Sequence, residues 1–115
     1  MPKVLVVEDD DIWFRIINQD FNGKVEVLRA KTLTEGDDLF RDNPEVDLII
    51  MDACVPGDFP NAMPLVKKII NSGYVKPIIA CSSMSPYIIK LVEAGATHQS
   101  DKGKVAEMAL KLLNL

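Results

Sequence analysis

The sequence lacks a long apolar run, has only two cysteines and carries no excess of positive charge. A bilayer-spanning helix needs about 20 consecutive apolar residues, so no contact with the membrane interior is expected. Cys54 and Cys81 are too few for the disulfide framework of a small secreted protein, which favours a reducing cytoplasm. The formal net charge of −4 argues against nucleic acid as a direct partner, because phosphate binding needs a basic face.

Low-complexity tracts and linkers are also missing, and the opening MPKVLVV is too short for a signal peptide. The chain has 115 residues, of which 48% are hydrophobic and 26% charged. That length is sufficient to bury a core without disulfides or structural metals. We therefore expect one domain over residues 1–115, as a monomer or a weak homodimer.

Short apolar runs alternate with longer amphipathic stretches along the whole chain. The runs predict strands at 3–7, 25–29, 47–51 and 76–81, and the rhythm adds a weak fifth at 97–100. Helical spacing of apolar residues predicts helices at 11–21, 34–42, 62–72, 85–94 and 104–114. Gly36 makes the second helix the least certain, and Ser85 is a possible N-cap for the fourth.

Five successive β–α units predict a doubly wound α/β fold, that is, a parallel five-stranded sheet with helices on both faces. Three of the predicted strands are nearly continuous apolar runs, as expected for strands that are covered on both faces. We expect the flavodoxin-like strand order 2-1-3-4-5 in a three-layer sandwich. Ligands of such sheets bind outside the carboxyl ends of the strands.

Polar residues follow four of the five predicted strands at that edge. They are Glu8 and Asp9 after the first strand, Asp52 at the end of the third, Ser82 after the fourth and Lys102 past the fifth. In the order 2-1-3-4-5 these four strands are consecutive neighbours. The groups would therefore face one crevice.

Each of these residues also has an ordinary structural interpretation. Acidic residues cap helix N-termini, and we expect Asp10 and Asp11 to do so. Asp52 could form a turn, Ser82 could bond its own backbone, and Lys102 could be a solvated surface lysine. These interpretations leave the coincidence at one sheet edge unexplained.

Carboxylates that converge within a few ångströms must shift their pKa values or share a cation. Hard oxygen ligands in a small, hydrated cluster suit Mg²⁺, which commonly bridges to phosphate. Asp52 would then lie between a divalent ion and the Lys102 ammonium. Such an arrangement stabilises a phosphoryl group in transfer, and a carboxylate nucleophile can accept it as an acyl phosphate.

With these residues in this order, the chain resembles the receiver domains of two-component response regulators over essentially its whole length. Glu8 and Asp9 match the acidic pair of that family, Asp52 the phosphoacceptor, Ser82 the Thr/Ser and Lys102 the lysine. The framing matches as well, with Pro56-Gly57 after the phosphoacceptor, Pro77 opening the fourth strand and AGA at 94–96.

The resemblance implies that a histidine kinase or a phosphotransfer protein donates a phosphoryl group to Asp52. It implies Mg²⁺ held by Asp9, Asp52 and the backbone carbonyl of Cys54, with Glu8 helping directly or through water. Ser82 and Lys102 would bond phosphoryl oxygens. The helix at 85–94 would then change its surface for a downstream protein. Such a domain is not an enzyme for other substrates, because it catalyses only its own phosphorylation and dephosphorylation.

Two positions depart from the family pattern. An aromatic residue is usual in the fifth strand, but Gln99 stands here, preceded by His98, for which we expect a structural or exposed role. Lys102-Gly103 replaces the usual Lys-Pro with its cis bond, so we expect a trans bond. These departures favour an alternative, a pseudo-receiver that docks proteins without depending on phosphate.

Three further inferences concern hydrolysis of the aspartyl phosphate, a zinc site and ligand binding. In this family, Cys54 and Met84 would flank the path of the water that hydrolyses the aspartyl phosphate, and neither side chain can orient water. We therefore predict slow hydrolysis. A zinc site of Cys54, Cys81 and His98 is disfavoured because no close ligand pair exists. A small flavodoxin-like ligand binder is disfavoured because no Gly-rich loop follows the first strand.

Overall fold

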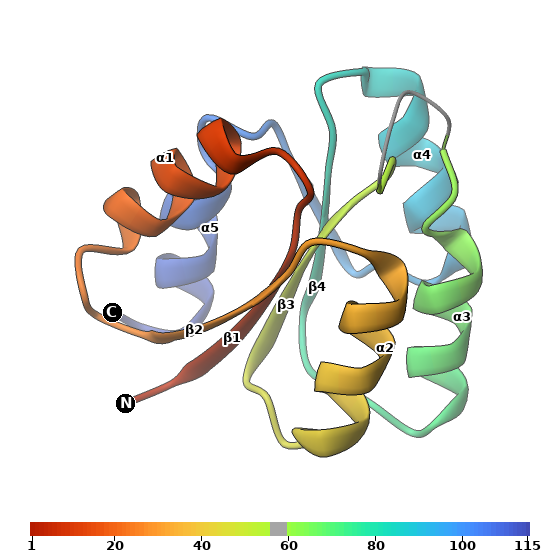
Figure 1. Cartoon of the computed structure of the whole chain (residues 1–115), viewed down its shortest axis with the longest axis horizontal. Coiled ribbons are helices and arrows are strands. Elements are labelled where there is room, and N and C mark those ends of the chain that lie inside the picture. Colours follow the sequence, from red (N-terminus) through yellow and green to blue (C-terminus); the bar gives the residue numbers. More distant parts are fainter. Residues whose placement is uncertain (56–59) are drawn as a thin grey trace.

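The computed structural model describes residues 1–55 and 60–115 and shows a parallel sheet between two layers of helices (Figure 1). The strands are β1 Lys3–Val7, β2 Glu26–Ala30, β3 Leu48–Asp52, β4 Ile78–Cys81 and β5 His98–Ser100. The helices are α1 Asp11–Phe21, α2 Leu33–Asp42, α3 Met63–Asn71, α4 Ser85–Ala94 and α5 Val105–Leu112. Every predicted element is present, with its ends within two residues of the expected positions. Pro56-Gly57 lies outside the described residues.

The five strands are all parallel and follow the order β2-β1-β3-β4-β5, which confirms the predicted fold class. The register aligns the strand ends: Val7 lies opposite Met51, and Asp52 opposite Cys81. Because parallel strands all end at the same edge, the residues that follow them are delivered to one side of the sheet.

Both faces of the sheet are covered, which explains the continuous apolar runs. Helices α1 and α5 lie on one face, whereas α2, α3 and α4 lie on the other (Figure 1). Alternate residues of β1 enter the two layers, with Val4 and Val6 in one core cluster and Leu5 and Val7 in the other. The central strand β3 is buried along its whole length, so it is a rigid support for the residues at its end.

Helix α2 forms despite Gly36, because this glycine allows the helix to approach the sheet closely. A Cβ atom at residue 36 would lie 3.1 Å from Val7 Cγ2 and 3.2 Å from Leu65 Cδ2. The close packing therefore offsets the low helix propensity of glycine, which is about 1 kcal/mol worse than that of alanine.

The helix bounds agree with the sequence, including those of α4, and only the N-cap of α4 differs. Asp10 caps α1 by accepting the backbone N–H groups of Ile12 at 2.8 Å and Trp13 at 3.0 Å. At α4 the N-cap residue is Met84 and makes no side-chain cap, so the expectation that Ser85 is the N-cap was wrong. The hydroxyl of Ser82 accepts the Met84 N–H at 3.1 Å, just before the helix begins. Within residues 1–55 and 60–115, no helix combines the length and apolar character needed to cross a bilayer.

Candidate functional site

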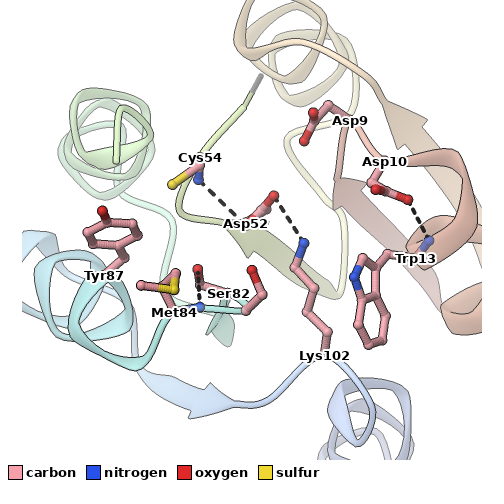
Figure 2. A pocket seen from close by; sticks show the side chains of 10 residues that line it. Asp9, Asp10, Trp13, Asp52, Cys54, Ser82, Met84, Tyr87 and Lys102 are labelled. Carbon is pink, nitrogen blue, oxygen red and sulfur yellow. Dashed lines mark hydrogen bonds and ion pairs between the residues drawn. The ribbon is translucent and has the colours of Figure 1, made fainter. Parts of the chain in front are cut away.

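A cavity of about 450 Å³ opens at the carboxyl edge of the sheet (Figure 2). It is lined by Asp9, Asp10, Trp13, Asp52, Cys54, Ser82, Ser83, Met84, Tyr87 and Lys102. The loops after β1, β3, β4 and β5 all contribute, as the topology requires. The predicted site residues thus share one cavity, with Glu8 buried beside it.

Three carboxylates converge at this edge. Oxygen atoms of Glu8, Asp9 and Asp52 all lie within 4.8 Å of one another, which confirms the predicted convergence. Glu8 is only 1% exposed and Asp52 only 4%. A cluster of carboxylate oxygens without nitrogen or sulfur is the donor set that Mg²⁺ prefers. The residues present therefore fit a magnesium ion.

Among the described residues, Lys102 is the cation that contacts this cluster and partly offsets its charge. Its Nζ lies 2.7 Å from Glu8 Oε1 and 3.4 Å from Asp52 Oδ2, and the residue is only 7% exposed. Glu8 Oε1 has no hydrogen bond of normal geometry, so its contact with Lys102 is an ion pair rather than a directed bond. The other Glu8 oxygen accepts the Asp10 backbone N–H at 3.1 Å.

The pKa values show that one lysine does not fully offset the burial of two acids. Burial raises the pKa of Glu8 to about 7, and the charge of Asp52 adds to the rise, against the opposing effect of Lys102. Burial likewise raises the pKa of Asp52. Burial alone would lower the pKa of Lys102, but the close contact with Glu8 and the negative charges of Asp52 and Glu8 outweigh it and raise that pKa. The site is therefore short of positive charge.

Ser82 and the backbone after Asp52 complete the inner wall. Ser82 is 6% exposed and uses its Oγ as an acceptor for Met84 N–H, so its hydroxyl hydrogen remains able to donate. The Cys54 N–H donates a long bond of 3.5 Å to Asp52 Oδ1. The metal-ligand role of the Cys54 carbonyl and the phosphoryl-binding roles of Ser82 and Lys102 remain predictions.

Sequence reasoning missed two residues that shape the site. The Trp13 ring centroid lies 5.7 Å from Lys102 Nζ, although the sequence placed Trp13 only on a helix face. Arg29 Nη2 donates to the Glu8 carbonyl at 3.1 Å and more weakly to the Asp9 carbonyl at 3.4 Å. The only sequence signal was that Trp13 falls in the first helical turn, next to the acidic residues.

No family model and no curated protein matches the sequence, but many solved structures match the fold. A response regulator from Thermotoga maritima is 20% identical with a TM-score of 0.80, and covers 100% of this chain and 99% of its own. The N-terminal domain of an uncharacterized protein from Wolinella succinogenes is 25% identical with a TM-score of 0.78, covering 98% and 94%. The BeF₃-activated DrrB receiver domain is 18% identical with a TM-score of 0.77, covering 100% and 99%. The fold is that of a receiver domain.

The two positions that depart from the receiver pattern, Gln99 and Gly103, lie differently relative to the site. Gln99 is exposed and borders a separate surface hollow of about 390 Å³ beside Ile88 and Ile89. Despite Gly103, Lys102 still reaches the acidic cluster.

The histidine and the cysteines do not form a rival metal site in the receiver fold. His98 is half-buried, with Nδ1 2.8 Å from Thr97 Oγ1, as a structural role requires. Cys54 and Cys81 pack in opposite core layers. Burial raises the pKa of the Cys81 thiol. Among residues 1–55 and 60–115, the three carboxylates are the only acidic, histidine or cysteine group close enough to bind a metal.

Proposed function

We propose that this chain is a phosphorylation-controlled switch of a two-component phosphorelay. Asp52 accepts a phosphoryl group from a histidine kinase or phosphotransfer protein in the cytoplasm, in a Mg²⁺-dependent reaction. The observation that supports this most strongly is the convergence of three carboxylates and Lys102 in one cavity of a receiver fold.

In the proposed reaction, one Asp52 oxygen forms a bond to phosphorus while the bond from phosphorus to the donor nitrogen breaks. The donor imidazole keeps the bonding electron pair and takes up a proton. Asp9, Asp52 and the Cys54 carbonyl would hold Mg²⁺, with Glu8 acting directly or through water. When bound, Mg²⁺ supplies positive charge that the buried carboxylates and the phosphoryl oxygens share.

Ser82 and Lys102 would stabilise the phosphoryl oxygens once the group is on Asp52. The Lys102 ammonium is already 3.4 Å from Asp52 Oδ2. The Ser82 hydroxyl has its hydrogen available for donation, because its oxygen accepts from Met84. A shift of Ser82 toward the phosphoryl group would alter the bond at Met84, the residue immediately before α4.

This link gives a route from the site to the surface. Helix α4 and its flanking loops would change the face that they offer to a downstream protein. Met84 is 52% exposed, Ile89 56% and Val92 40%, so the helix already presents apolar side chains. The protein would catalyse only its own phosphorylation and dephosphorylation, and it would act on other proteins by binding them rather than by contacting nucleic acid.

The decisive experiment is incubation with acetyl phosphate and Mg²⁺, followed by intact-mass measurement. We expect a gain of one phosphoryl group that is lost without Mg²⁺ and lost in Asp52→Asn. Asp47→Asn is the matched control, since Asp47 directly precedes β3 and Asp52 ends it. If Asp52→Asn gains the same mass as the natural protein, Asp52 is not the acceptor.

A second candidate is a phosphate-independent docking module with the same fold. The exposed position of Gln99 favours it, because the fold here lacks the aromatic residue usual in receiver domains. The same experiment separates the two: absence of any mass gain with a competent donor would support the docking module.

A further inference from the structure

We propose that Trp13 is a positioning residue for Lys102, whose indole ring keeps the ammonium group aimed into the cavity. The inference rests on the proposed function of Lys102 as a phosphoryl contact. Its starting observation is that Lys102 Nζ lies over the Trp13 ring, 5.7 Å from the centroid, while the same atom contacts Glu8 and Asp52. In Figure 2 the indole lies beside the Lys102 side chain, whose nitrogen points toward Asp52.

The backbone around Lys102 restrains this side chain weakly. The next residue, Gly103, is exposed, and the turn is closed by a long hydrogen bond of 3.3 Å from Lys104 N to the Asp101 carbonyl. A lysine side chain has four flexible torsions and loses much rotamer freedom when it is held in one place. Contacts with other side chains must therefore orient the Lys102 ammonium group, because the backbone does not.

The backbone of Trp13 is held in place at the start of α1. Its backbone N–H donates to the Asp10 carboxylate at 3.0 Å, in the cap that starts α1. An indole presents a negatively polarised face, which attracts an ammonium group within about 6 Å. The cap of α1 thus fixes the backbone from which the indole extends, and the Trp13 ring borders the lysine.

The carboxylates cannot perform this task throughout the reaction. Glu8 and Asp52 attract Lys102 in the metal-free protein, but both belong to the cluster that would bind Mg²⁺. A divalent ion would neutralise them and weaken their hold on the ammonium. Among the described contacts of the Lys102 ammonium, the Trp13 ring is the one that a metal ion does not take over.

The test uses the fact that Trp13 is the only tryptophan of the chain. Biosynthetic replacement by tryptophans with one, two or three ring fluorines weakens the negative face stepwise and changes the ring shape little. The first readout is the affinity for BeF₃⁻ in the presence of Mg²⁺. We expect a graded loss that reaches about 3- to 10-fold, with Trp13→Leu at least as weak and Trp13→Phe intermediate.

The matched background is Lys102→Met, in which fluorination should change nothing. The second readout is the urea midpoint without Mg²⁺, which should fall stepwise with fluorination only where Lys102 is present. A purely packing role would produce equal effects in both backgrounds, or none, and would overturn the inference. If the unsubstituted protein does not bind BeF₃⁻ at all, the proposed function fails, whereas the metal-free midpoints still decide whether Trp13 holds Lys102.

Discussion

The residue just before β3 and the last residue of β3 are both aspartates, each paired with a lysine at the same distance but in opposite environments. Asp47 Oδ1 lies 3.4 Å from Lys76 Nζ, with side chains 41% and 45% exposed. Asp52 Oδ2 lies 3.4 Å from Lys102 Nζ, with side chains 5% and 7% exposed. A backbone N–H from Lys3 and the Lys76 contact lower the pKa of Asp47, whereas burial raises the pKa of Asp52.

The comparison teaches that burial, and not the distance between the charged atoms, distinguishes the two pairs. An exposed ion pair is screened by water and contributes little to stability. A buried pair keeps the cost of removing two charges from water, and Glu8 adds a third charge beside Asp52. The exposed pair is electrically satisfied, while the buried group can still gain from a cation and a phosphate.

The largest expected effect comes from removing the lysine of each pair. Lys102→Met should lower the free energy of unfolding by about 3 kcal/mol at pH 8 without Mg²⁺, because it leaves Glu8 and Asp52 buried without a counter-charge. Lys76→Met should change it little. Urea denaturation of both variants measures the difference, and equal losses would show that burial does not separate the pairs.

The next effect is a dependence of stability on pH. The folded pKa of Glu8, about 7, exceeds its ordinary value of 4.5, so the folded state binds more protons between these values. Metal-free stability should therefore fall as pH rises from 4.5 to 7, on the order of 1–3 kcal/mol. Glu8→Gln should flatten this slope. Asp47 has the opposite sign, since its lowered pKa contributes stability that is lost only in acid, below about 4.

Thermal unfolding checks the sign for Glu8 between pH 4.5 and 7, and the sign for Asp47 when the pH is lowered below about 4. A rise in stability from pH 4.5 to 7 would contradict the predicted sign, and an equal fall in Glu8→Gln would contradict the assignment of the slope to Glu8.

A smaller effect is expected from magnesium. If the carboxylate cluster binds Mg²⁺ only when folded, the ion at ten times its Kd should stabilise the protein by about 1.4 kcal/mol. Asp52→Asn should reduce this gain and Asp47→Asn should keep it. Melting temperatures with and without Mg²⁺ provide the measurement, and an equal gain in both variants would place the ion elsewhere.

The smallest effect concerns the rate at which water hydrolyses the aspartyl phosphate at Asp52. Cys54 and Met84 line the cavity and neither orients a nucleophilic water, so the aspartyl phosphate should persist well beyond seconds at room temperature. Met84→Asn should shorten its lifetime a few-fold, equivalent to about 1 kcal/mol of barrier. Intact mass followed over time after donor removal gives the lifetime, and loss of the phosphoryl group within seconds in the natural protein would refute the prediction.

The fold was predictable because its main signal is local. Strands covered on both faces must be apolar throughout, so β3 with its five buried residues was visible as a run. The short strand β5 lacks such a run and was inferred only from its place in the alternation. The start of α4 at Ser85 was predicted correctly, and only its N-cap residue, Met84, differs from the expectation.

The part of the candidate site that follows from the sheet topology was predictable. The residues Glu8, Asp9, Asp52, Ser82 and Lys102 follow strands, and a parallel sheet brings strand ends together. Trp13 and Arg29 were missed because their positions depend on how α1 and β2 pack against the acidic residues 8–10 after β1. No local sequence pattern encodes that packing. The preference of Lys102 for Glu8 over Asp52 is likewise a matter of tenths of an ångström.

Gly36 links the geometry of the acidic cluster to α2, a helix that does not line the cavity. Its nearest neighbour is Val7, the residue directly before Glu8 in the chain. Adding a methyl group there would require the Val7 side chain to give way by a few tenths of an ångström. A shift of that size passed on to Glu8 would disturb the proposed magnesium site. Under the proposed function, Gly36→Ala would therefore weaken phosphorylation of Asp52 while the folded protein stays nearly intact.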